Sequence, residues 1–296
     1  MRITNRHHLP AAIVQAVSND PYPHGKTGDI SATSLISPPQ LVALKRQFAD
    51  QLEEDAADRI WALFGHSIHT ILERADLDGL HEIRLFAHVN GWDISGQADR
   101  LAPAGQHPKA RIIEDYKTTS VWSVIDGPKS EWVNQLYVLQ WLAEQNGYQI
   151  PGMRIIALLR DWSRSKSLAG NYPLAPVIQF GIHPMDSMDL GAWIDERVAA
   201  HRLCQQAMVT GSPLTPCTPA ERWERPAVYA VKVPGRKSAL RLWDSPSAAQ
   251  DHATATKGAY VEHRPGEAVR CAGYCPVASF CQQRQAELSA DLALAA

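Results

Sequence analysis

Two aspartates and a lysine are spaced so that they could act together on a phosphodiester bond. Asp115 and Lys117 lie two residues apart behind Ile112-Ile113, so on a strand their side chains leave the same face. Asp99 ends the preceding predicted strand, and a loop could return the chain so that Asp115 lies beside it. Carboxylates suit a hard cation such as Mg²⁺ or Mn²⁺, which polarises a phosphodiester and activates water. The alternative, a surface ion pair, is less consistent with a strand that enters the core.

A histidine in the preceding segment could complete the same site. The segment Gly65 to Glu73 has helical spacing, so His69 and Glu73 share a face, and Gly65 allows close backbone approach. The alternative for a single histidine is a hydrogen-bonded, partly buried side chain. His66 and His69 also suggest zinc, but only two ligands are near and no His-Glu-x-x-His sequence occurs. This segment therefore supports the carboxylate site.

The elements that must position these residues follow from periodicity. A helix is expected through 60–72, and His81 to Val89 alternates as a strand. Asn90-Gly91 predicts a tight hairpin to a second strand over 92–101, and 111–117 reads as a third. A helix follows Pro128 and stops at Gly147, and 153–159 is a buried strand expected to run parallel to 111–117. The fold class is therefore an α/β core of helix, three-stranded meander, helix and parallel strand.

The remaining sequence predicts additions on both sides of this core. Residues 1–38, rich in Pro, Gly and Ser, predict an irregular arm, and 40–59 reads as a polar helix with a solvated acidic face. A strand is expected at 177–182 and a helix at 189–208, followed by a Pro-rich linker from 211 to 220. We therefore divide the chain into an arm at 1–38, a core at 39–210 and a C-terminal region at 211–296.

Taken in order, these motifs resemble the PD-(D/E)XK nuclease superfamily, and within it the RecB-like and phage-type exonuclease branch. The resemblance covers roughly residues 65–160: Gly-x-x-x-His, Ser-Gly-Gln-Ala-Asp, Ile-Ile-Glu-Asp-Tyr-Lys and a helix bearing a glutamine. It implies a restriction-endonuclease-like fold and a divalent metal. It also implies metal ligands at His69, Asp99, Asp115 and the Tyr116 carbonyl, and catalytic roles for Asp99, Asp115, Lys117 and Gln135.

Two positions need comment within this resemblance. The family's helix usually carries Gln-x-x-x-Tyr, whereas Leu139 stands four residues after Gln135 and Tyr137 lies on a different helical face. That difference affects the role of the tyrosine and leaves the metal site untouched. Glu114 is expected to point away from Asp115, so it ranks second as a ligand.

Basic residues suggest a path for DNA. Arg160, Arg164 and Lys166 follow the parallel strand, and phosphate attraction of this kind is tolerant of sequence. A second basic set between 222 and 241 interleaves with aromatic residues, which fits a strand-tracking groove and equally a solvated surface with structural tryptophans. No base-reading motif is present, so we expect DNA binding without sequence specificity.

Three cysteines near the C-terminus form a Cys-x3-Cys-x5-Cys pattern at Cys271, Cys275 and Cys281. In RecB-like exonucleases a similar triplet joins one upstream cysteine to hold a [4Fe–4S] cluster, but residues 1–68 contain no cysteine. Cys217 or Cys204 could supply the fourth thiolate, His263 could complete a zinc site, and the thiols could also be a reduced, packed remnant. Any such centre would be structural.

Composition limits the class of protein. With 29 Lys+Arg, 31 Asp+Glu and a net charge of -2, the chain is not a globally basic nucleic-acid binder. No apolar run approaches a membrane span and the start lacks a signal peptide, so we expect a cytoplasmic protein. Gly25-Lys26-Thr27 does not complete a phosphate loop, because Asp20 stands where its first glycine belongs.

These observations favour a Mg²⁺- or Mn²⁺-dependent deoxyribonuclease, expected to be an exonuclease in phage or bacterial recombination, repair or DNA processing. Its expected partners are DNA, either linear duplex or single strand, and a recombination protein or further copies of itself. The rival is a non-catalytic DNA-binding or scaffold protein that retains the nuclease fold. Such a scaffold has no need of Asp99, Asp115 and Lys117 together, so their joint presence favours catalysis.

Overall fold

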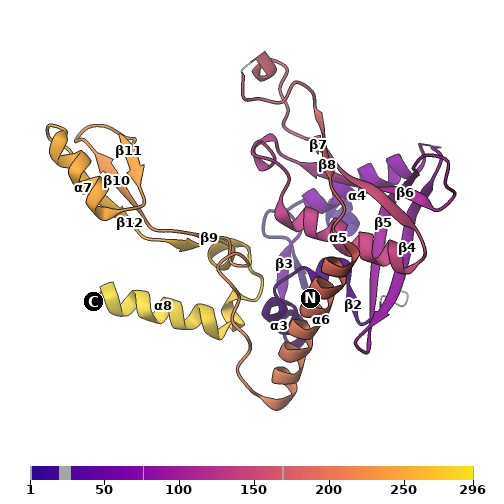
Figure 1. The fold of residues 1–296 in the computed structure, drawn as a ribbon. Coiled ribbons are helices and arrows are strands. Elements are labelled where there is room, and N and C mark those ends of the chain that lie inside the picture. Colours follow the sequence, from indigo (N-terminus) through magenta and orange to yellow (C-terminus); the bar gives the residue numbers. More distant parts are fainter. Residues whose placement is uncertain (1, 20–27, 76, 169, 296) are drawn as a thin grey trace. The chain divides into compact units, whose positions relative to one another are not determined.

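The computed structural model describes residues 2–19, 28–75, 77–168 and 170–295, with side chains described through 290 (Figure 1). Gly25-Lys26-Thr27 lies outside these ranges. The chain divides into two compact units. One comprises Met1–Val42 and Ala49–Pro213, and the other Ala43–Phe48 and Leu214–Ala296.

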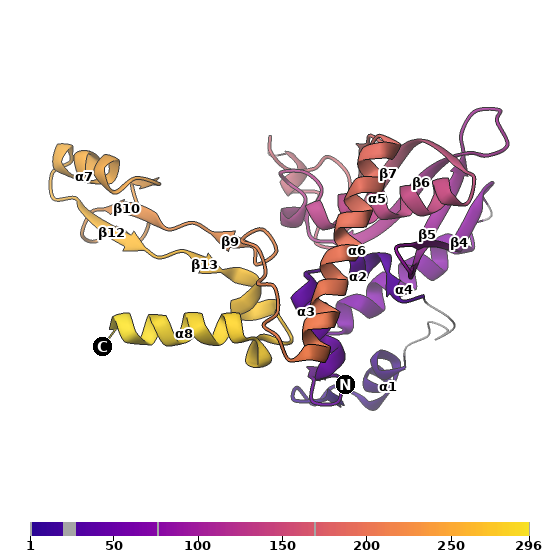
Figure 2. The same ribbon diagram turned by 60° about the horizontal axis from the view of Figure 1, so that its bottom comes forward.

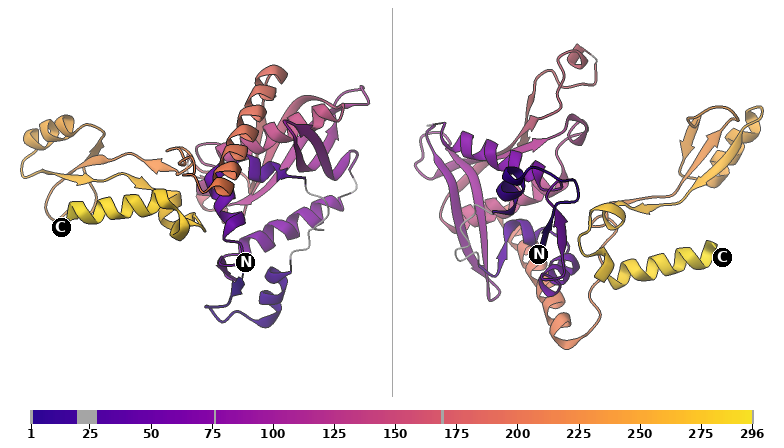
Figure 3. Two further views of the ribbon diagram at one scale, coloured as in Figure 1. Left: turned by 90° about the horizontal axis from the view of Figure 1, so that it is seen from below. Right: turned by 180° about the vertical axis from the view of Figure 1, so that it is seen from behind.

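A six-stranded mixed sheet forms the centre of the first unit. The predicted meander is confirmed, because β4 (Leu80–Val89), β5 (Trp92–Pro103) and β6 (Ala110–Thr119) pair antiparallel in succession. β7 (Gln149–Leu159) pairs parallel to β6, as expected, and β8 (Val177–Ile182) pairs antiparallel to β7. The right view of Figure 3 shows this sheet, in purple and magenta, as strongly twisted.

The β4–β5 hairpin has the tight turn that its sequence predicts. Asn90 and Gly91 have φ values of 49° and 78°, the left-handed conformations that a two-residue type I′ turn requires. The turn pairs Val89 with Trp92, which sets the register of the two strands. This register decides which residues of β4 lie opposite those of β5.

Helices cover both faces of the β6–β7 pair. Leu136 and Leu139 of α5 (Ser130–Gln145) belong to the main core together with Ile113 and Ile155 of these strands. Side chains alternate between the two faces of a strand, and Thr118 and Leu158, on the other face, line a pocket with α4 (Ile60–Glu73). The catalytic candidates of β6 thus lie between α4 and α5.

A long helix completes the first unit. α6 (Ser187–Thr210) packs along α5, with Leu190, Ile194 and Val198 fully buried, and Figure 2 shows the two helices close together. α5 is followed by Gly147 at φ 80°, the stop that the sequence predicts. Within the described ranges, no helix is both long and apolar enough to span a membrane.

Two expectations for the N-terminal part are wrong. The predicted irregular arm contains β1 (Arg2–Thr4), α1 (Ala11–Ser18), β2 (Ile30–Ser31) and α2 (Ala32–Leu35). The predicted 40–59 helix is only α3 (Pro39–Gln47), because Glu53–Asp55 forms β3, which pairs parallel to β1. Asp55 is buried rather than solvated, since Thr4 and Arg6 donate hydrogen bonds to its carboxylate. Long-range pairing therefore overrides local helical character.

The second unit is built around a narrow pair of short strands. β9 (Glu224–Arg225) pairs antiparallel to β13 (Glu267–Ala268), and the chain between them forms a separate small sheet, which Figure 2 shows at the end of this ribbon. That sheet comprises β10 (Val228–Lys232), β11 (Arg241–Trp243) and β12 (Tyr260–Arg264), covered by α7 (Pro246–Ala255). The single-turn helices η3 (Arg270–Tyr274) and η4 (Ala278–Phe280) and then α8 (Gln282–Ala295) follow.

Candidate functional site

The site forms where β5 and β6 separate. Their ladder ends at the pair Arg100 and Glu114, so the next residues, Asp99 and Asp115, lie beyond the last backbone bonds. Instead, the Asp99 carboxylate enters the fork and its Oδ2 accepts a hydrogen bond from the Tyr116 backbone N–H at 2.7 Å. This bond fixes Asp99 against the segment that carries Asp115 and Lys117.

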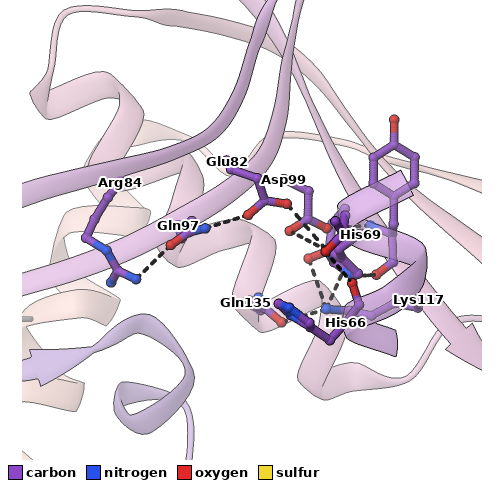
Figure 4. A network of polar contacts seen from close by, with 11 residues as sticks. His66, His69, Glu82, Arg84, Gln97, Asp99, Lys117 and Gln135 are labelled. Atoms are coloured by element: carbon purple, nitrogen blue, oxygen red, sulfur yellow. Dashed lines mark hydrogen bonds and ion pairs between the residues drawn. The ribbon is translucent and has the colours of Figure 1, made fainter. Parts of the chain in front are cut away.

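His69 reaches the same residue, Tyr116, from α4. Its Nε2 lies 3.0 Å from the Tyr116 carbonyl oxygen, and because a carbonyl only accepts, Nε2 carries a proton. Its Nδ1 lies 3.4 Å from Asp99 Oδ1 and 3.6 Å from Glu82 Oε1 (Figure 4). Neutral His69 therefore presents its lone pair on Nδ1, toward two carboxylates, as a metal-binding imidazole does.

The two carboxylates also determine the charge of His69 when no cation is bound. Hydrogen bonds to Asp99 and then Glu82 raise the pKa of His69 to about 10, against the opposing effect of burial. The imidazolium thus occupies the place of a cation between these carboxylates. Binding of a metal ion would displace the proton from Nδ1.

Glu82 is the site residue that sequence reasoning missed. It lies on β4 with φ 47°, a left-handed conformation that is rare for a non-glycine residue and interrupts the ladder opposite Asp99. The sequence could have indicated Glu82, because the Asn90-Gly91 turn pairs Val89 with Trp92. Counting seven residues away from the turn along each strand puts Glu82 opposite Asp99. Glu73, which the helical spacing suggested, is exposed.

A chain of hydrogen bonds orients Glu82. Gln97 donates its side-chain amide to Glu82 Oε2, and Arg84 donates from Nη2 to Gln97 Oε1 at 2.7 Å (Figure 4). Burial opposes ionisation of Glu82, but the bonds from His69 and Gln97 hold its pKa below the usual value. Glu82 is therefore a carboxylate at neutral pH.

Asp115, Lys117 and Gln135 form the other half of the site. Lys117 Nζ lies 2.9 Å from Asp115 Oδ2 and 3.0 Å from Gln135 Oε1 of α5. These two partners hold the ammonium in place. Asp115 is 1% exposed, and burial raises its pKa despite the opposing charge of Lys117, while the charge of Asp99 adds to the rise. The predicted catalytic residues therefore lie within electrostatic reach of one another.

Among the described residues, only some of the predicted ligands lie close together. Ligand atoms of His69, Glu82 and Asp99 all lie within 4.8 Å of one another. Asp115 is outside this group and forms an ion pair with Lys117. The Tyr116 carbonyl accepts the hydrogen bond of His69. A metal-ligand role for Asp115 or the Tyr116 carbonyl stays a prediction.

The donor set fits a hard divalent cation. It offers two carboxylates and one imidazole lone pair, and Mg²⁺ takes oxygen ligands while Mn²⁺ also accepts imidazole. Glu114 does not belong to it, because its buried carboxylate holds Arg100 at 2.6 Å and Arg154 at 2.7 Å. Glu114 thus takes partners different from those of Asp115, as strand alternation predicted. Leu139 lies in the core, and Tyr137 packs against Trp193.

The predicted DNA-contacting residues lie at the end of β7. Arg160 directly follows this strand, and its backbone N–H donates to the Thr119 carbonyl of β6. Arg164 and Lys166 lie in the exposed connection between β7 and β8. In the second unit, Arg222 and Lys232 form ion pairs with glutamates, which favours the solvated-surface interpretation for these two members of the second basic set.

Four cysteines gather in the second unit. Burial raises the pKa of the Cys217 thiol to about 12, and the charges of nearby Glu221 and of Cys281, Cys271 and Cys275 add to this rise. Gln283 binds both backbone groups of Cys217, donating to its carbonyl and accepting from its N–H. Cys204, the other candidate, is buried in α6 of the first unit.

The chain is similar to one known protein family and to several solved structures. The family model of the PD-(D/E)XK nuclease superfamily matches residues 40–282. A comparison with curated protein sequences gave no match.

Similar solved structures include SSO0001, with a TM-score of 0.42, 14% identity and coverage of 64% of this chain and 82% of that one. An alkaline exonuclease, LHK-Exo from Laribacter hongkongensis, has a TM-score of 0.38, 16% identity and coverage of 61% and 89% respectively. In complex with dAMP, LHK-Exo gives a TM-score of 0.39, 16% identity and coverage of 62% and 90%. Because the family model covers most of its length, the chain belongs to the PD-(D/E)XK nuclease superfamily.

Proposed function

We propose that this nuclease is a Mg²⁺- or Mn²⁺-dependent deoxyribonuclease that hydrolyses phosphodiester bonds. The observation that carries the proposal is the arrangement of four side chains around one residue, Tyr116. Asp99 and His69 bind the N–H and the carbonyl of Tyr116, and Asp115 and Lys117 flank that residue in sequence. A scaffold protein would not require this arrangement.

Each side chain has a separate role in this proposal. His69, Asp99 and Glu82 would hold the cation, with Asp115 and the Tyr116 carbonyl as further ligands. When bound, the cation would supply Lewis-acid polarisation of the phosphodiester and lower the pKa of a water. Lys117 would place a positive charge on the scissile phosphate, where charge develops in the transition state. Gln135 would keep the ammonium in position through its 3.0 Å hydrogen bond.

The basic residues after β7 support DNA as the substrate. Arg160, Arg164 and Lys166 are exposed and follow the end of β7, the strand that pairs with β6. Contacts of arginine and lysine with phosphates would bind DNA without sequence preference. Exonuclease action, in bacterial or phage recombination or repair, follows from the resemblance of the motifs to the RecB-like and phage-type branch. We also propose a recombination protein or a homo-oligomer as partner, and the cytoplasmic location stays a prediction from the sequence.

The cysteines of the second unit would form a structural metal centre. Cys217 would join Cys271, Cys275 and Cys281, because these thiols lie within electrostatic reach of one another. The resemblance to RecB-like exonucleases favours a [4Fe–4S] cluster at these cysteines, and zinc is the alternative.

Digestion of labelled DNA tests the catalytic proposal. Linear and circular, single- and double-stranded DNA are incubated with Mg²⁺, Mn²⁺ or EDTA. We expect cleavage of linear DNA that needs a divalent cation and is lost in Asp115→Asn and Lys117→Met. Asp93→Asn and Lys109→Met, which alter exposed residues away from the fork, should cleave as the wild type does.

The outcomes separate the proposal from its rival. Cleavage of circular as well as linear DNA would contradict the exonuclease assignment while supporting the nuclease. A wild type that binds Mn²⁺ but cleaves none of the substrates would favour the non-catalytic DNA-binding protein. Activity retained in Lys117→Met would refute the role given to that ammonium.

A further inference from the structure

An apolar pocket lies on α4 beside the candidate metal site. It has a volume of about 520 Å³ and is lined by Trp61, Phe64 and Ile68 of α4 with Leu158 of β7 and Val177 of β8. Trp61 is 54% exposed and Phe64 is 53% exposed, so two aromatic rings face solvent rather than the core. Contiguous exposed apolar surface of this kind usually marks a binding site.

The pocket lining includes one cation, Arg160, and one carboxylate, Asp161, whose Oδ1 accepts a hydrogen bond from the Val121 backbone N–H. The Arg160 guanidinium lies 3.8 Å from the centre of the Trp61 ring, which is a close cation–π contact. Trp61 in turn lies beside Phe64, with 5.8 Å between the ring centres. An aromatic floor with an arginine above it suits a ligand that has both flat rings and negative charge.

The pocket and the metal site occupy neighbouring sides of the same elements. Ile68 of the pocket precedes His69 of the site, and successive helical residues point roughly 100° apart. Thr118 of the pocket follows Lys117 on β6, so it leaves the opposite face of the strand. Both lie near the end of β6 and β7, because Lys117 precedes Thr118 and the pocket residue Arg160 directly follows β7. A chain molecule held at Lys117 could therefore reach Trp61 around the ends of these strands.

We propose that this pocket binds unpaired nucleobases of the strand being cleaved, so that the substrate class is DNA with a single-stranded end. This inference rests on the proposed function. Stacking on aromatic side chains accepts every base, because each base has a flat π-face. Arg160 would bind the phosphate between stacked bases.

The test separates base stacking from phosphate attraction. Fluorescence anisotropy in EDTA, which prevents cleavage, measures binding to three labelled duplexes: blunt, with a single-stranded tail, and with an abasic tail of the same length. We expect the wild type to bind the normal tail roughly tenfold more tightly than the abasic tail. Both tails carry the same phosphates, so the ratio reports the bases.

Matched variants locate the effect. Trp61→Leu and Phe64→Leu keep an apolar side chain at exposed positions and should reduce the ratio toward one. Phe86→Leu changes another exposed phenylalanine of the same unit, on β4 and outside the pocket, and should keep the wild-type ratio. Melting curves followed by circular dichroism check that all variants are folded.

The results that would overturn the inference are distinct from those that concern catalysis. Equal wild-type affinity for both tails, or a ratio that survives in both pocket variants, would refute base binding. A wild-type dimer that Trp61→Leu converts to a monomer, by light scattering, would assign the pocket to a second copy of the chain instead. If the wild type discriminates the tails but cleaves no DNA, the proposed nuclease function is refuted and the assignment of the pocket to bases is retained. If it cleaves DNA but does not discriminate the tails, only the assignment of the pocket is refuted.

Discussion

Glu82 provides the sharpest test of the candidate metal site. Glu82→Gln keeps the size of the side chain but removes its charge. Nδ1 of His69 lies 3.6 Å from Glu82 and 3.4 Å from Asp99, so the two carboxylates stand almost equally close to the position of a cation. We therefore expect the variant to bind Mn²⁺ more weakly than the wild type.

The expected size of the effect follows from the partial burial of Glu82. A carboxylate and a divalent cation about 4 Å apart interact by roughly 8 kcal/mol at an effective dielectric constant near 20. The side chain is 20% exposed, and the loss of its hydration offsets most of that energy. If about a sixth remains, the change is near 1.4 kcal/mol, which is a tenfold higher dissociation constant.

Isothermal titration calorimetry with Mn²⁺ measures this constant directly. Glu73→Gln is the matched control, because Glu73 is an exposed glutamate four residues after His69 on the same helix. Its affinity should equal that of the wild type. Wild-type affinity in Glu82→Gln, or an equal loss in both variants, would refute the assignment of Glu82 as a ligand.

Three further predictions concern stability and the second metal centre. A Cβ on Gly96 would lie 2.7 Å from Leu142 Cδ1 and 3.2 Å from Ala32 Cβ, so Gly96→Val should lower the free energy of unfolding by about 1–3 kcal/mol in urea titrations. Gly152→Val has open space, and an equal loss there would contradict this reason. Backbone N–H bonds from Arg6 and then Ala57 lower the pKa of Asp55 from 3.8 to about 2, so its contribution to stability is present above pH 3.8 and is lost as the pH falls toward 2. Asp55→Asn should therefore show a flatter decline in stability over this range in urea titrations at fixed pH, and a decline equal to that of the wild type would refute the assignment. Iron analysis of anaerobically purified protein should find iron in the wild type and in Cys204→Ala but little in Cys217→Ala, and iron retained in Cys217→Ala would exclude it as a ligand.

The sequence was informative where local pattern and long-range structure agree. Alternation in β4 and the Asn90-Gly91 turn predicted a hairpin, and the apolar run before Leu159 predicted a strand parallel to β6. The positions of Asp115 and Lys117 follow from alternation alone, since both leave β6 on one side. Such features depend on neighbours that are close in sequence.

The features that could not be predicted depend on distant partners. β2 has two residues and forms only because Ile30 and Ser31 pair with Ile94 and Ser95 of β5. Glu82 reaches the site through a left-handed backbone conformation that glutamate rarely adopts. Trp61 and Phe64 are of residue types usually found in a core, so sequence alone gave no indication that their rings are exposed.

The short β9–β13 pair has a consequence for how this family member could diversify. Arg225 and Glu267 face each other across the pair, so the forty-one residues between them start and end at adjacent points of the second unit. The small sheet and α7 have their own apolar interior, formed by Val231, Ala249 and Ala253. A recombination event could exchange this module for another, or remove it, while Cys217 and the C-terminal cysteines keep their own backbone supports.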